Sequence, residues 1–341
     1  MCFSKVHACH RETSKKDAGE IITYINMTYT AVIRTLGTAG NKFQRLLTSL
    51  ESQTLPPKAI LVYIANGYPI PKETIGIEKY IYVEKGMLSQ RALLYEEVDT
   101  EYMLFLDDDL EFPSDTVQRM FELLEVNEAD VISPDIFSNA NRSFKSEVMM
   151  TLSGRMRARR NDDTWGYRVM LTGGYSYNKT PTKEVYLSET NAGACFMCGK
   201  KDFLRVKLHD ELWVDAMPYP LGEDQVMYYK MHRLGLKQLT WYNHGFKHLD
   251  GGGNMTPEKE AKRLYGDVFF KIVFWHRFIL NPEKNRLLRI WSCLAISYML
   301  AFTTISSLLK LRLDILKVKY NAIIEGLRFI KSEEYKKIPL I

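Results

Sequence analysis

The chain of 341 residues is long enough to bury a large core, and its 46% hydrophobic and 12% aromatic content excludes a disordered protein. The net charge of +5 is spread through the first two thirds and then concentrates after Arg286, which argues against a nucleic-acid groove and for contact with an anionic membrane surface. Five cysteines, an odd number, suggest a reducing compartment, and we interpret Cys195 and Cys198 as a buried structural pair rather than a zinc or redox motif.

Strand and helix patterns alternate after a polar tail at residues 1–26. The run at 28–33 reads as a strand, and the helix at 42–53 places Phe43, Leu46, Leu47 and Leu50 on one face. Further strands at 59–65 and 80–83 lead to a helix that carries Gln90 and Arg91. This alternation predicts an α/β fold with a mainly parallel open sheet flanked by helices.

A strand followed by three acids is the central feature of the sequence. Residues 102–106 are apolar, and Asp107, Asp108 and Asp109 follow at the carboxyl end, the edge where open α/β sheets bind ligands. Adjacent carboxylates repel one another, so a hard divalent ion such as Mg²⁺ or Mn²⁺ carrying substrate phosphates would stabilise them. A solvated acidic turn before Pro113 is the alternative.

Three later features can belong to the same site. A small-residue strand at 190–197 contains Gly193, which allows close approach of a ligand. Glu223 and Asp224 open a helix, where the helix dipole alone can explain acids. His248 stands before a glycine loop and is either a ligand or a packing residue.

The order of these segments resembles the nucleotide-sugar half of family 2 glycosyltransferases of the GT-A fold. Five segments carry the resemblance: the strand at 28–33, the helix segment Ser49–Gln53, the strand at 60–62, the segment 86–91 and Leu106-Asp-Asp-Asp109. The similarity extends over roughly residues 27–250. The resemblance implies an inverting transfer from a nucleotide diphosphate sugar, with Asp224 of the Glu-Asp motif as general base. It also implies that Asp109 and His248 hold the metal and that substrate is bound by Arg34, Thr35, Asn66, Arg91, Asp107, Gly193 and Glu223.

One departure concerns the donor base. The family commonly has an Asp that holds uracil after the second strand, and this chain has Ala65 there. Ala65 accepts no base N–H, so the sequence favours a non-uridine donor, or a base contact from Asn66, Arg34 or Arg91.

Residues 138–188 are polar and rich in arginine. The arginines at 155–160 and the stretch Trp165-Gly-Tyr-Arg168 can bind a diphosphate or an acceptor, but we favour an exposed basic loop and place no site here.

The last part of the chain changes character. Residues 290–309 form an uncharged run long enough to cross a bilayer, with basic residues at both ends. An interfacial helix on the cytoplasmic leaflet is the alternative to a span. We therefore expect a catalytic domain at 27–250, divided at 137/138 into nucleotide-sugar and acceptor halves, a linker with an amphipathic helix at 251–289 and membrane-associated helices at 290–341.

The sequence thus predicts a metal-dependent glycosyltransferase at the cytoplasmic face of a membrane, acting on a glycan or lipid-linked acceptor in cell-surface glycan or polysaccharide synthesis. Two alternatives stay open. A nucleotidyltransferase also uses carboxylates and Mg²⁺ at strand ends, and a membrane-tethered sugar-binding module would keep the fold without turnover.

Overall fold

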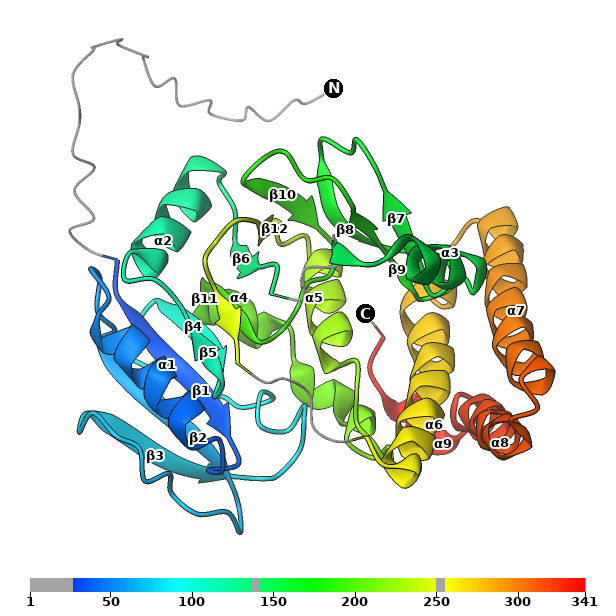
Figure 1. Cartoon of the computed structure of the whole chain (residues 1–341), viewed down its shortest axis with the longest axis horizontal. Helices are drawn as coiled ribbons and strands as arrows, with labels where there is room; N and C mark the ends of the chain where they lie inside the picture. Colours follow the sequence, from blue (N-terminus) through cyan, green and yellow to red (C-terminus); the bar gives the residue numbers. More distant parts are fainter. Residues whose placement is uncertain (1–26, 137–140, 250–254, 341) are drawn as a thin grey trace, which may run out of the picture.

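The computed structural model describes residues 27–136, 141–249 and 255–340. The polar tail predicted at residues 1–26 lies outside them. Figure 1 shows an α/β body with a sheet through its centre and a group of C-terminal helices at one end.

Four parallel strands form the N-terminal part of the sheet, in the order β3-β2-β1-β4. They are β1 (Tyr29–Thr35), β2 (Ala59–Ala65), β3 (Glu78–Val83) and β4 (Tyr102–Asp107). β1, β2 and β4 are almost wholly buried, which is typical of strands covered on both faces. Helix α1 (Asn41–Glu51) buries the predicted side chains Phe43, Leu46, Leu47 and Leu50, and α2 (Thr116–Val126) follows β4.

Within the described residues, eleven strands join in one sheet of order β3-β2-β1-β4-β11-β6-β12-β10-β8-β9-β7. The strands beyond β4 are β6 (Val131–Pro134), β7 (Met156–Arg159), β8 (Trp165–Val169), β9 (Tyr175–Asn178), β10 (Val185–Ser188), β11 (Cys195–Gly199) and β12 (Gln238–Trp241). Parallel and antiparallel pairings mix in this half. The fold class predicted from the sequence, α/β with a mainly parallel open sheet, is confirmed.

Two local predictions are wrong. Residues 86–92 form turns rather than a helix, because the carboxylate of Asp215 accepts hydrogen bonds from the backbone N–H groups of Leu88 and Ser89 at 2.9 and 2.8 Å. The strand expected at 190–197 begins only at Cys195, and the residues before it form a loop. Cys195 and Cys198 are buried free thiols, as predicted.

The C-terminal helices pack on the same body. They are α6 (Pro257–Phe274), a π-helical turn η3 (Trp275–Leu280), α7 (Arg286–Leu309), α8 (Leu313–Phe329) and α9 (Glu333–Lys337). Phe270 and Phe274 of α6 share a core with Trp213 of the 3-10 turn η2 (Leu208–Val214) and with Val226. The buried carboxylate of Glu211 binds the Arg277 guanidinium through two contacts of 2.6 Å.

Helix α7 differs from its neighbours in what it exposes. Among the described residues it is the one helix long and apolar enough to cross a membrane, and 22% of its most apolar window is buried. In Figure 1 it is the outermost helix at one end of the molecule, and β3 lies at the opposite end. The division into domains predicted from the sequence stays a prediction.

Candidate active site

The acid cluster follows β4, beside the end of β1. Register pairs Arg34 with Asp107, and the Arg34 Nε donates to Oδ1 of Asp107 at 2.6 Å. Burial alone would raise the pKa of Asp107, but the charges of Arg34 and Arg91 outweigh it and lower that pKa. Asp107 is therefore held as an anion by protein cations.

The other two acids point elsewhere. Asp108 accepts a short hydrogen bond from the Thr35 hydroxyl, and burial followed by repulsion from Asp109 and Asp107 raises the pKa of Asp108 to about 6. Asp109 has a buried Oδ1 that receives no hydrogen bond from the described residues. That oxygen lies 3.2 Å from Nε2 of His248.

A two-stranded ribbon brings His248 to the acids. β5 (Leu110–Glu111) pairs with β13 (Lys247–His248), and His248 stands opposite Leu110, next to Asp109. The described residues contain no group of three or more metal-ligating side chains. A carboxylate oxygen that lacks a proton donor beside an imidazole nitrogen fits a cation whose other positions are filled by substrate oxygens and water.

A cavity of about 630 Å³ opens on the acid cluster. Basic and polar side chains from β1, α1 and the 85–90 turn face the acids across it. Of the predicted residues it brings together Arg34, Thr35, Asp107, Asp109 and His248, and it adds Lys42, Lys85, Gln90 and Asp108. Asn66 is exposed in the turn after β2 and does not line this cavity.

On the other side of Asp107 lies the first turn of α5 (Glu223–Arg233). The Arg91 guanidinium, 3% exposed, donates to Oδ1 of Asp224 at 2.7 Å, reaches Oδ1 of Asp107 at 3.3 Å and also donates to the Gly193 carbonyl. The predicted residues Arg91, Asp107, Gly193 and Asp224 thus form one contact network.

Gly193 must be a glycine in this arrangement. A Cβ built there would overlap the carboxylate of Asp224 and stand 2.6 Å from Nη1 of Arg91. The absence of a side chain lets the loop before β11 lie directly under the Arg91–Asp224 pair.

Glu223 is the more buried of the two acids that open α5, at 4% exposed. Burial, and then the charge of Asp224, raises the pKa of Glu223, while Oε1 of Glu223 lies 3.3 Å from Nη2 of Arg34.

Asp224 faces a second cavity, of about 170 Å³, lined also by Tyr167, Tyr175, Asn191 and Gln225. Two tyrosines, an amide pair and an accessible carboxylate suit a hydroxyl-bearing acceptor.

Sequence reasoning missed several of these residues. Gln90 stands in a segment predicted as helix, Lys85 stands just before that segment, and Tyr175 lies on a short strand within the polar stretch 138–188. The only local signal was Lys85-Gly86 directly after a strand, a place where parallel sheets bind ligands.

Comparison with known proteins gives one family. Residues 73–205 match the model of glycosyl transferase family 2. The match confirms the predicted resemblance over a segment that includes Arg91, the three acids and Gly193. Asp224 and His248 lie beyond it. A search of the curated proteins found no match.

Among solved structures, the chain is similar to a crystal structure of GalNAc-T7 with UDP, GalNAc and Mn²⁺. The identity is 13% and the TM-score 0.47, over 82% of this chain and 55% of that one. The chain thus spans about half the length of the solved relative.

Proposed function

We propose that this chain, whose residues 73–205 match the glycosyl transferase family 2 model, moves a sugar from a nucleotide diphosphate donor to an acceptor hydroxyl with inversion, using a divalent cation. The observation that carries the proposal is the Arg91 bridge, since it sets the cavity with the acid cluster and the cavity at Asp224 side by side. Donor and acceptor can then meet between them.

Asp109 and His248 would hold Mn²⁺ or Mg²⁺, which supplies charge neutralisation of the departing diphosphate when bound. Lys42 and Lys85 line the same cavity and can contact phosphate oxygens. Asp107 is paired with two arginines, so its expected task is to bind donor hydroxyls or to position those arginines.

Asp224 is the proposed general base. Its carboxylate faces the acceptor cavity, so it can take the proton of an attacking hydroxyl. Glu223 is nearly inaccessible and its Oε1 lies beside Arg34, so its expected task is to position Arg34 rather than to contact the acceptor.

Ala65 bears on which nucleobase the donor carries. This residue ends β2 and is fully buried, so it offers no acceptor to a nucleobase. We expect a non-uridine donor, or a base contact supplied from Arg34 or the 85–90 turn. Arg34 has little freedom for this, because Asp107, Glu223 and the Met87 carbonyl already bind its guanidinium.

Membrane attachment at the cytoplasmic face belongs to the same proposal. α7 exposes large apolar side chains, with Leu287, Trp291 and Leu309 at 69%, 63% and 79%. A membrane-bound glycan or lipid-linked acceptor, used in cell-surface glycan or polysaccharide synthesis, would then diffuse in the same membrane to which the enzyme is attached.

A thermal-shift panel tests the donor assignment. UDP, GDP, dTDP and CDP are each added to the full chain with Mn²⁺ and again after chelation. We expect at least one nucleotide to raise the melting temperature only when metal is present. No metal-dependent shift with any nucleotide would contradict the proposal, and a UDP-only shift that survives each of Arg34→Ala, Lys85→Ala and Gln90→Ala would contradict the base assignment.

A further inference from the structure

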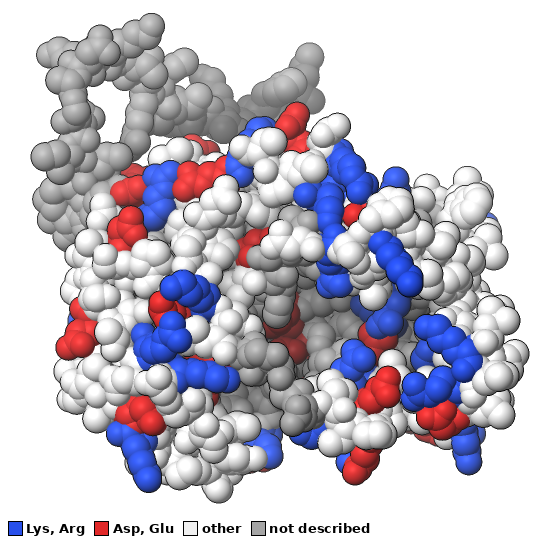
Figure 2. All heavy atoms as spheres, in the orientation of Figure 1, with Lys and Arg blue, Asp and Glu red and all other residues white. Residues whose placement is uncertain are grey.

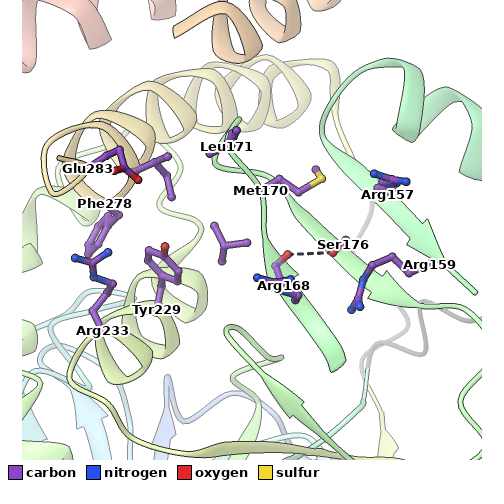
Figure 3. Close-up of a pocket in the computed structure, with 12 residues that line it drawn as sticks. Arg157, Arg159, Arg168, Met170, Leu171, Ser176, Tyr229, Arg233, Phe278 and Glu283 are labelled. Carbon is purple, nitrogen blue, oxygen red and sulfur yellow. Dashed lines mark hydrogen bonds between the residues drawn. The ribbon is translucent and has the colours of Figure 1, made fainter. Parts of the chain in front are cut away.

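A basic pocket lies next to the C-terminal helices. Its volume is about 430 Å³, and four arginines from three elements line it, with Glu283 as the one acid among the lining residues. Figure 3 shows Arg157, Arg159 and Arg168 on the strands at one side and Arg233 on a helix at the other. On the face in Figure 2, Lys and Arg side chains gather over this end of the molecule.

The sheet register builds the arginine side of the pocket. Across β7, β9 and β8, Arg157 stands opposite Ser176, and Ser176 stands opposite Arg168. Opposed residues share a face of a sheet, and Arg159, two residues after Arg157, is on that face too. The three guanidinium groups are therefore placed by paired strands rather than by a flexible loop.

The positive charge in the pocket is only partly balanced. Arg159 pairs with Asp162, and Nε of Arg168 lies 3.3 Å from Glu189. In the part of the chain that the structure describes, Arg157 and Arg233 have no carboxylate partner. Burial, and then the charge of Arg168, lowers the pKa of Arg159. An anion in the pocket would relieve this repulsion.

The pocket is separate from the reaction centre. Arg233 follows Asp224 by nine residues on α5, which is two and a half turns of an α-helix, so the two side chains leave opposite sides of it. An anion held by Arg233 is therefore not the group that reacts at Asp224.

The pocket adjoins α7 instead. Leu171 lines it, and the Leu171 carbonyl accepts a hydrogen bond of 3.2 Å from Ser292 of α7. The neighbouring Trp291 is 63% exposed, and tryptophan prefers the level of lipid headgroups. The other wall contains Phe278 and Ile279 of the π-helical turn, a distortion frequent at functional sites.

We propose that this arginine pocket binds the phosphate group of a membrane lipid whose acyl chains lie against the outer face of α7. Arginine suits the task because its planar, permanently charged guanidinium donates two hydrogen bonds to one phosphate. The lipid would hold the enzyme on the membrane independently of sugar transfer, since no step at Asp224 involves it.

Vesicle flotation tests the proposal. The full chain is mixed with vesicles of phosphatidylcholine, with or without phosphatidic acid. Arg157→Gln/Arg233→Gln removes the two unpaired charges, and Lys72→Gln/Lys79→Gln removes two exposed charges near β3 at the opposite end of the molecule. At about 5-fold for each charge, we expect the pocket variant to bind phosphatidic acid vesicles about 30-fold more weakly. The control variant should bind phosphatidic acid vesicles as strongly as the wild type. The pocket variant should keep the wild-type rate of donor hydrolysis and the wild-type binding to vesicles of phosphatidylcholine alone.

Equal losses in the two variants would overturn the proposal, because they would indicate diffuse surface charge. If the double variant does not fold, the exposed Arg157→Gln alone should still weaken binding about 5-fold, and Arg157→Lys should restore most of it.

A calorimetric titration with inorganic phosphate, without vesicles, separates the two possible sources of phosphate. If the wild type binds phosphate and the pocket variant does not, but the pocket variant still floats with phosphatidic acid vesicles as the wild type does, the pocket binds a soluble anion. That result would overturn the lipid assignment. Phosphate that competes with wild-type flotation, beyond the effect of NaCl at equal ionic strength, would support it.

Discussion

Arg91 and Asp224 form a partly buried ion pair of 2.7 Å, and Arg91 reaches Asp107 at 3.3 Å with its other nitrogen. Asp107 and Asp224 are 23% and 25% exposed. One guanidinium thus balances two carboxylates that would otherwise repel each other across the site. Arg91 is a positioning residue for both, and it links the metal side of the site with the base.

Replacing Arg91 should therefore destabilise the fold. Arg91→Ala leaves Asp107 and Asp224 without this partner, and the free energy of unfolding should fall by about 3 kcal/mol, the lower end for a broken buried pair because both acids keep some solvent. Arg119→Ala removes an exposed pair with Glu184 and should cost less than about 1 kcal/mol. Urea unfolding measures both. Similar losses in the two variants would show that the Arg91 bridge is not a stabilising contact.

Gly193 tests whether the geometry of that bridge matters for transfer. Gly193→Ala places a methyl group on the Asp224 carboxylate and against Arg91, so turnover should fall by roughly 10² or more, as it does when a catalytic group is displaced by about 1 Å. Gly199→Ala, at the other end of β11, meets only a contact of 3.4 Å with Asp202 and serves as the matched control. Donor turnover is measured for both, and wild-type rates in Gly193→Ala would refute the close packing at Asp224.

Asp109 tests the metal assignment. Asp109→Ala removes the buried oxygen that receives no hydrogen bond from the described residues and lies beside His248, and it also relieves repulsion in the acid cluster. We expect the variant to fold normally but to lose Mn²⁺-dependent nucleotide binding, as measured by calorimetry. Donor affinity that still depends on Mn²⁺ to the wild-type extent would sink this assignment.

The sequence predicted the parts of the site that follow local pattern. The apolar run before Asp107 marks a buried strand, and Gly222 before Glu223 marks a helix start, so both acids could be placed from neighbours in the chain. Arg91 was named, but its turn was missed, because the conformation of that segment depends on the carboxylate of Asp215, more than a hundred residues away.

The arginine strands show the same limit. Residues 156–178 alternate apolar and polar residues only over short runs, such as Trp165, Tyr167 and Val169, and glycines and charged residues separate these runs. The pairing of β7 with β9 and of β8 with β9 and β10 joins them into a sheet. The amino-acid sequence alone does not reveal that Arg157 and Arg168 lie on the same face of the sheet, on either side of Ser176. The sequence indicated a basic stretch, and the pairing placed it beside α7.

Lys271 should make the stability of the folded chain depend on pH. It is buried, and burial lowers its pKa to about 8, while Nζ lies 3.3 Å from the Gly173 carbonyl and from Oε1 of Gln225. Between pH 8 and the usual lysine pKa, the unfolded chain binds more protons than the folded one, so stability rises with pH through this window. Relative to Lys271→Met, the wild type should gain on the order of 3 kcal/mol from pH 7 to above 10. A difference that stays constant with pH would mean that the pKa of Lys271 is unshifted.

The reaction itself is tested most directly by NMR of donor hydrolysis, in which water replaces the acceptor. Wild type with Mn²⁺ should release the sugar first as the inverted anomer, because a single displacement of the nucleotide diphosphate by a water molecule, whose proton Asp224 takes, inverts the anomeric carbon. Asp224→Asn keeps the shape but removes the basicity, so turnover should fall by roughly 10² to 10⁴ with nucleotide affinity nearly unchanged, whereas Glu223→Gln should lose less. An Asp224→Asn enzyme that turns over at close to the wild-type rate while Glu223→Gln is inactive would contradict this and make Glu223 the base.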